Sequence, residues 1–84
     1  MYYVYVLQSE KDGKNYTGFT HNLKQRFEEH QRGRVESTKE RRPLKIIYYE
    51  ASTDQADALH RKKYLKTAHG KRYLRQRLKS YFMG

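Results

Sequence analysis

The pattern that most constrains the fold is a pair of β-type segments separated by a short polar break. Residues 2–7 and residues 15–20 are both rich in aromatic and β-branched side chains. The break between them contains Asp12 and Gly13, a dipeptide that is typical of tight turns. The pattern therefore predicts an antiparallel β-hairpin at the start of the chain.

The expected pairing of this hairpin predicts which side chains share a face. If the loop has an even number of residues, odd positions of the first strand lie opposite even positions of the second. Tyr3, Tyr5, Leu7, Tyr16 and Gly18 then lie on one face, and a slip of two residues changes neighbours but not faces. We therefore expect two phenols, those of Tyr5 and Tyr16, beside a position without a side chain.

Length and composition fit one small domain over residues 1–84 with a basic surface. Nineteen Lys and Arg against nine acidic residues give a formal net charge of +10. This excess predicts a polyanionic partner, nucleic acid first and an acidic protein surface as the alternative. The absence of cysteine excludes disulfides and thiolate zinc sites. No apolar run approaches the roughly 18 residues of a membrane span, so we expect no membrane segment and a cytoplasmic location.

A helix is expected over residues 22–32, because Asn22 and Gln25 have the spacing of a capped helix start. Arg26 and His30 are one turn apart on the edge of its apolar stripe. Both are candidates for a polar site. The alternatives are a solvated surface charge for Arg26 and a hydrogen-bonded residue at the core boundary for His30.

Residues 34–42 lack apolar periodicity and precede Pro43, so a basic loop is expected. Basic and hydroxyl side chains in such a loop suit contacts to a phosphate backbone. The candidates are Lys39, Arg41 and Arg42, together with the hydroxyls of Ser37 and Thr38. The alternative is a loop that is exposed only because nothing packs on it.

The second half of the chain predicts one strand and two helices. The mostly apolar run over residues 44–50 indicates a third strand, central in the sheet and covered on both faces. A helix over residues 55–67 would bury Ala58, Leu59 and Leu65. A break at His69 and Gly70 would precede a final amphipathic helix. The expected fold is α+β, in the order ββαβαα, with a small three-stranded antiparallel sheet flanked by helices.

Lys62 is the least expected residue of this half. It lies four residues after Ala58 and three before Leu65, on the inward face of its helix. Burying an unpaired ammonium is costly, so its side chain must extend outward or find an acceptor.

Several of these segments together resemble the GIY-YIG nuclease domain family, in particular its small stand-alone members. The first motif corresponds to Tyr3-Val4-Tyr5 and the second to Tyr16-Thr17-Gly18, where Gly18 has a structural role. Arg26 and His30 follow at the spacing of the family. The resemblance continues through residues 37–39, 42–44, 58–59 and 65–66, so it covers nearly the whole chain.

The resemblance implies roles for four residues. Tyr5 and Tyr16 would be the phenols, one of them a general base, Arg26 the phosphate clamp and His30 the proton partner. The alternative for each tyrosine is an ordinary strand aromatic. In the family a glutamate holds Mg²⁺, and its place here is occupied by Lys62, whose ammonium cannot coordinate the ion and would repel it. A substitute carboxylate would have to come from Glu50, Asp54 or Asp57 in a rearranged site.

Three functions follow from these expectations. The first is an endonuclease that hydrolyses phosphodiester bonds of DNA, with Mg²⁺ as the cofactor that the resemblance implies. The alternative is a nucleic-acid-binding module without cleavage, in which Lys62 contacts phosphate as a point charge and Lys66 adds a further contact. The third is a protein-interaction domain that has kept only the scaffold.

Overall fold

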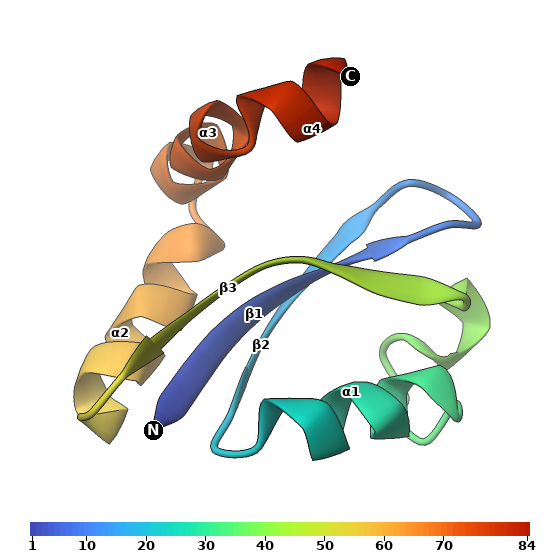
Figure 1. Ribbon diagram of the computed structural model, residues 1–84, viewed down its shortest axis with the longest axis horizontal. Coiled ribbons are helices and arrows are strands. Elements are labelled where there is room, and N and C mark those ends of the chain that lie inside the picture. The colour runs from blue at the N-terminus through green and yellow to red at the C-terminus, as the bar shows by residue number, and fades with distance from the viewer.

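The computed structural model describes residues 1–84 and shows a three-stranded sheet between helices (Figure 1). The sequence-predicted order ββαβαα is confirmed, except that the last helix is divided in two at Leu78. The elements are β1 (Tyr2–Ser9), β2 (Asn15–Thr20), α1 (Leu23–Gln31), the short 3-10 helix η1 (Lys39–Arg41), β3 (Leu44–Ser52), α2 (Gln55–Leu65), α3 (Ala68–Arg77) and α4 (Lys79–Met83).

The sheet is antiparallel with the strand order β2-β1-β3, so β1 is the central strand. Four consecutive residues of β1, from Val4 to Leu7, are buried because helices cover both faces. The prediction that the third strand is central was therefore wrong. The apolar run of β3 has another cause: Ile46 packs on the α1 side and Tyr48 on the α2 side, while the outer edge of β3 pairs with no strand.

Two apolar clusters lie on opposite faces of the sheet. On the α1 side, Tyr5, Leu7 and Leu44 are buried beneath Leu23 and Phe27. The other cluster joins β1 to α2 and α3; its buried members are Val4, Ala58 and Leu65, with Phe19, Tyr64 and Tyr73 packed around them. None of the helices has both the length and the apolar character that are needed to cross a bilayer.

The inward face of α2 differs from the predicted stripe. Ala58 and Leu65 are buried, but Leu59 is 38% exposed. Arg61 is half-buried, and its guanidinium lies over two tyrosine rings and donates to both carboxylate oxygens of Glu50 at 3.0 Å. The prediction that Leu59 is buried was therefore wrong, and a paired arginine, three residues after Ala58 and four before Leu65, belongs to the inward stripe instead.

The joint between α2 and α3 lies earlier than predicted. Thr67 caps α3, because its hydroxyl accepts a hydrogen bond from the Gly70 N–H at 3.1 Å. Gly70 is therefore inside the first turn of α3 and does not break a helix. It is buried against the end of α2, where a Cβ atom would collide with the Tyr64 carbonyl and lie 2.6 Å from the Leu65 Cα.

Candidate active site

The hairpin register places the two phenols as the sequence predicted. Tyr5 pairs with Gly18, and Leu7 pairs with Tyr16. Cross-strand partners point to the same face, so both tyrosines lie on the side that α1 covers. The Tyr5 ring lies across Gly18, where an added Cβ would overlap Cζ and the phenol oxygen. Gly18 therefore provides the space in which the Tyr5 phenol sits.

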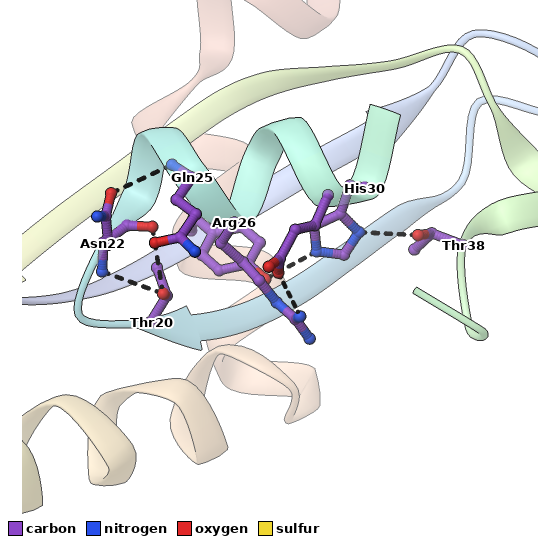
Figure 2. Close-up of polar contacts among 8 residues, drawn as sticks. Thr20, Asn22, Gln25, Arg26, His30 and Thr38 are labelled. Carbon is purple, nitrogen blue, oxygen red and sulfur yellow. Dashed lines mark hydrogen bonds and ion pairs between the residues drawn. The ribbon is translucent and has the colours of Figure 1, made fainter. Parts of the chain in front are cut away.

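A buried hydrogen-bond chain starts at this phenol. The Tyr5 hydroxyl oxygen lies 2.8 Å from His30 Nε2, and His30 Nδ1 lies 2.8 Å from Thr38 Oγ1. Figure 2 shows His30 reaching from α1 to Thr38. Tyr5 is 1% exposed, and His30 and Thr38 are fully buried. The expectation that the Thr38 hydroxyl is free to contact phosphate was therefore wrong, because it is used inside the protein.

Burial determines the protonation states along this chain. Desolvation raises the pKa of Tyr5, while the nearby Arg26 guanidinium works in the opposite direction. Desolvation, with Arg26 adding to it, lowers the pKa of His30 to about 4. At neutral pH the phenol is protonated and the imidazole is neutral. The arrangement that satisfies all three groups has the phenol donating to Nε2 and Nδ1 donating to the Thr38 oxygen.

Arg26 and Tyr16 lie where this buried chain meets the surface. The Arg26 Nη1 donates to Glu29 Oε1 at 2.9 Å, and the two side chains are 38% and 35% exposed. Figure 2 shows Arg26 projecting from α1 beside His30. Tyr16 is half-buried, and its ring centre lies 5.2 Å from that of His30 in an edge-on arrangement. A ligand can therefore reach Tyr16 and the Arg26–Glu29 ion pair, but not the buried Tyr5, His30 and Thr38.

The segment before β3 holds its basic residues with internal contacts. Arg41 pairs with Asp12 at 3.5 Å, and Arg42 donates through Nε to the Lys39 carbonyl oxygen at 2.8 Å. Lys39 itself pairs with Glu36 at 3.2 Å. These contacts shape a compact basic segment, and its contact with nucleic acid stays a prediction.

Lys62 and Lys66 belong to the other side of the molecule. Their helix region packs on the sheet face that carries Val4, opposite the face of Tyr5. Lys62 is half-buried and makes no hydrogen bond or ion pair with the residues around His30. The structure thus brings Tyr5, Tyr16, Arg26 and His30 together, and leaves Lys62 outside the polar cluster.

The carboxylates near the predicted site do not fit a magnesium centre. No group of three or more His, Cys, Asp or Glu side chains is arranged to hold a metal ion. Three carboxylates already have guanidinium partners: Glu29 pairs with Arg26, Glu50 with Arg61, and Asp12 with Arg41. Mg²⁺ requires oxygen ligands that are free to coordinate it. Glu50 in addition accepts from the Tyr48 hydroxyl, and Asp54 accepts from the backbone as the cap of α2.

The sequence analysis did not identify Glu29 as a site residue, and it identified Thr38 only as a possible phosphate contact and not as the partner of His30. Glu29 lies three positions after Arg26, a spacing that brings the two side chains together on a helix. That spacing was a usable signal. Thr38 is distant from His30 in sequence, and no local pattern indicates that its segment folds back over α1.

A phenol pair next to a strand glycine, with arginine and histidine on the following helix, is the arrangement expected of a GIY-YIG domain. The GIY-YIG catalytic domain matches residues 1–77, and the chain belongs to the GIY-YIG family of nuclease domains.

The most informative relatives are small proteins of similar length. A UPF0213 protein of Limosilactobacillus reuteri is 43% identical over 68 residues, which cover 77% of this chain and 70% of the relative. A UPF0213 protein of Clostridium perfringens is 39% identical over 67 residues, 79% of this chain and 71% of the relative. A UPF0213 protein of Staphylococcus haemolyticus is 36% identical over 67 residues, which cover 79% of this chain and 80% of the relative. No solved structure matches the chain.

Proposed function

We propose that this protein is an endonuclease that hydrolyses phosphodiester bonds of DNA at the surface formed by Tyr16 and Arg26. The observation that carries the proposal is the position of these two partly exposed side chains next to the buried chain of Tyr5, His30 and Thr38. The family membership supports a nuclease. The formal net charge of +10 supports a polyanionic substrate.

Each group has a separate task in this proposal. Arg26 holds the phosphate oxygens, because a guanidinium donates hydrogen bonds in a fork that matches them. The Tyr16 hydroxyl orients the attacking water, whose oxygen forms the new bond to phosphorus as the bond to the leaving oxygen breaks. Tyr5 and His30 lie too deep to touch the substrate, so they act as positioning residues for Tyr16 and Arg26. The proton of the attacking water passes to solvent at this partly exposed site, and the leaving oxygen takes up a proton from solvent.

The basic residues outside the cluster would hold the flanking DNA backbone. Those proposed are Lys39, Arg41 and Arg42 before β3, and Lys62 and Lys66 on and after α2. GIY-YIG nucleases generally use divalent metals. Because the carboxylates of this chain do not fit a Mg²⁺ site, no step of the proposed reaction is assigned to the ion.

A second candidate function is a DNA-binding module that does not cleave. The observation that favours it is the pairing of Glu29, Glu50 and Asp12 with arginines, together with Lys62 at the position where the resemblance places a glutamate. In this alternative Arg26 still binds a phosphate group, but nothing activates water.

Strand-break assays on plasmid and branched DNA separate the two candidates. With Mg²⁺ titrated into the assay, we expect wild type to cut and Tyr16→Phe to lose at least about tenfold in rate, because water positioning by a side chain typically contributes on the order of 10² or more. Tyr49→Phe, which changes an exposed tyrosine of β3, serves as the matched control. If wild type binds DNA but does not cleave it, the endonuclease proposal fails and the DNA-binding module is the function that stands.

Lys62→Glu adds a second arm to this assay. Because Lys62 lies on the sheet face opposite Tyr5 and outside the polar cluster, the variant should gain neither metal affinity nor metal-stimulated cleavage. A gain of metal-stimulated cleavage would contradict this separation and would support Lys62 as the counterpart of the metal-holding glutamate.

A further inference from the structure

We infer that the protein binds a single-stranded segment of DNA in the groove between the β1–β2 hairpin and the C-terminal helices, across the edge strand β2 from the proposed cleavage site. This inference rests on the proposed function and specifies its substrate: duplex with a single-stranded tail or branch. Figure 1 shows α3 and α4 lying beside the hairpin, away from α1. The groove between them has a volume of about 1170 Å³.

The charge of the groove fits a nucleic-acid backbone. Four basic side chains line it, Lys66, Lys71, Arg75 and Lys79, and no acidic residue does. Lys71 and Arg75 are four residues apart on α3, so they lie on one face of that helix, and Lys79 begins α4 after the break at Leu78. Cations that line one groove in this way can contact successive phosphates of one strand.

The floor of the groove favours exposed bases over a closed duplex. Leu74, Phe82 and Met83 line it beside the cations. Phe82 is 39% exposed and Met83 is 77% exposed. A duplex presents its phosphates and hides its base faces, whereas an unpaired base can stack on an exposed aromatic ring. Basic side chains next to a solvent-exposed aromatic ring therefore favour single-stranded DNA over a duplex.

Contacts of Tyr81 hold the neighbouring Phe82 ring, on which an unpaired base would stack. The Tyr81 hydroxyl donates to the Gln8 side-chain oxygen of β1, and the Lys45 ammonium of β3 lies 5.1 Å from the centre of the Tyr81 ring. The rings of Tyr81 and Phe82 are 5.2 Å apart, edge to face. These contacts anchor α4 to the sheet and hold Phe82 at the groove.

The groove and the proposed site lie on opposite faces of the sheet and meet at the edge strand β2. Asn15, Tyr16 and Thr17 form the hairpin wall of the groove, whereas the Tyr16 ring lies on the α1 face beside His30. The outer edge of β2 pairs with no strand, so a single strand that leaves the groove reaches the Tyr16 hydroxyl by passing around this edge. This path places a junction between paired and unpaired DNA at the edge of β2.

Equilibrium binding of labelled oligonucleotides tests the inference. The probes are a short blunt duplex, the same duplex with a single-stranded tail, and a longer blunt duplex with the same total number of nucleotides as the tailed one. We expect the tailed probe to bind about tenfold more tightly than the blunt probe of equal size, because stacking adds to charge neutralisation. Equal affinity for these two probes would overturn the inference.

Two pairs of variants assign the preference to the groove. Phe82→Ala should remove most of the tail preference and leave blunt-duplex affinity within about twofold, whereas Tyr49→Ala, an exposed aromatic elsewhere, should not. Arg75→Ala with Lys79→Ala should reduce the salt slope for tailed DNA by about 1.4. The matched double variant Lys63→Ala with Arg72→Ala removes the same charge outside the groove, and an equal effect of both would overturn the inference.

Failure of the proposed function has a different signature. If no probe binds, or if Arg26→Ala changes the affinity for none of them, the proposed function and the inference fall together. If Arg26→Ala weakens all probes while tailed and blunt DNA of equal size bind alike, only the inference fails.

Discussion

At the scale of single residues, burial separates two kinds of polar group in the site. Tyr5 and His30 are 1% and 0% exposed, and their pKa shifts keep both uncharged near neutral pH. Arg26 remains charged and 38% exposed. A buried uncharged chain behind an exposed cation places the positive charge where a phosphate can reach it, which is the electrostatic requirement of the proposed function.

Gly18→Ala should disturb the site directly. The added methyl group would overlap the Tyr5 ring and push its hydroxyl away from His30. Overpacking of this kind typically costs about 1–3 kcal/mol. Urea denaturation measures this loss, and the NMR signals of the His30 ring report the displaced phenol.

Thr17→Ala is the control for Gly18→Ala. Thr17 is adjacent on β2 but points to the opposite face of the sheet, since it pairs with Val6. Its replacement should leave the His30 signals unchanged. A Gly18→Ala variant with wild-type stability and unchanged His30 signals would contradict the packing described for Tyr5.

The depressed pKa of His30 makes stability depend on pH in a defined window. The folded value is about 4 and the unfolded value is about 6.5, so the unfolded state binds more protons between them. The free energy of unfolding should therefore rise with pH from about 4 to 6.5. The contribution of His30 is fully present above about pH 6.5 and is lost as pH falls, by up to about 3 kcal/mol.

Two measurements isolate this effect from the carboxylates. An NMR titration of the His30 imidazole should give a midpoint near 4. In His30→Gln the rise in unfolding free energy over the same window should shrink by the His30 contribution. A titration midpoint near 6.5 would show that His30 is not desolvated in solution.

At the scale of elements, local patterns predicted the structure where it depends on neighbours in sequence. The face shared by Tyr5, Tyr16 and Gly18 follows from strand alternation, and the structure confirms it. Asn22 caps α1 by accepting from the Gln25 N–H at 3.1 Å, as the sequence predicted (Figure 2). Asp54 caps α2 in the same way, by accepting from the Asp57 N–H at 3.1 Å.

The misread elements depend on packing between distant segments. An apolar run shows that β3 is covered on two faces, but not whether a further strand pairs with its outer edge. The same applies to Gly70, which resembles a helix breaker in sequence. Its role comes from the close approach of α3 to the end of α2, and single-sequence patterns carry no information about that distance.

Gly70→Ala tests this joint. Alanine is intrinsically better than glycine in a helix by about 1 kcal/mol, so an open position would be stabilised. Here the methyl group meets the Tyr64 carbonyl and the Leu65 backbone, and we expect a net loss of at least about 1 kcal/mol in unfolding free energy. Arg72→Ala, an exposed position of α3, should be nearly neutral. Stabilisation by Gly70→Ala would contradict the tight α2–α3 contact.

At the scale of the whole molecule, the candidate site joins segments that are far apart in sequence. The resemblance to GIY-YIG domains predicted the candidates Tyr5, Tyr16, Arg26 and His30, and the fold brings these four together. Their roles stay proposals. Thr38 closes the chain from a segment predicted as an open loop, and Lys62 lies with the other helix layer. The positions of Thr38 and Lys62 could be determined only from the three-dimensional structure.

The distribution of charge has the same global origin. Several arginines form ion pairs with acidic residues of the same chain, including Arg26, Arg41 and Arg61. Of the three, Arg26 is the one beside the buried chain of Tyr5 and His30. Its ion pair with Glu29 is partly exposed, so an incoming phosphate group can exchange with the carboxylate at modest cost.

The affinity of Arg26→Gln for a DNA duplex is the most direct test of a phosphate site at the mouth of this cluster. The control is Arg32→Gln, which removes the same charge from the exposed end of the same helix. We expect Arg26→Gln to weaken binding at least about tenfold, as the loss of a charge-assisted hydrogen bond to phosphate requires. Arg32→Gln should cost less than about threefold. Equal losses in the two variants would contradict a phosphate site at Arg26.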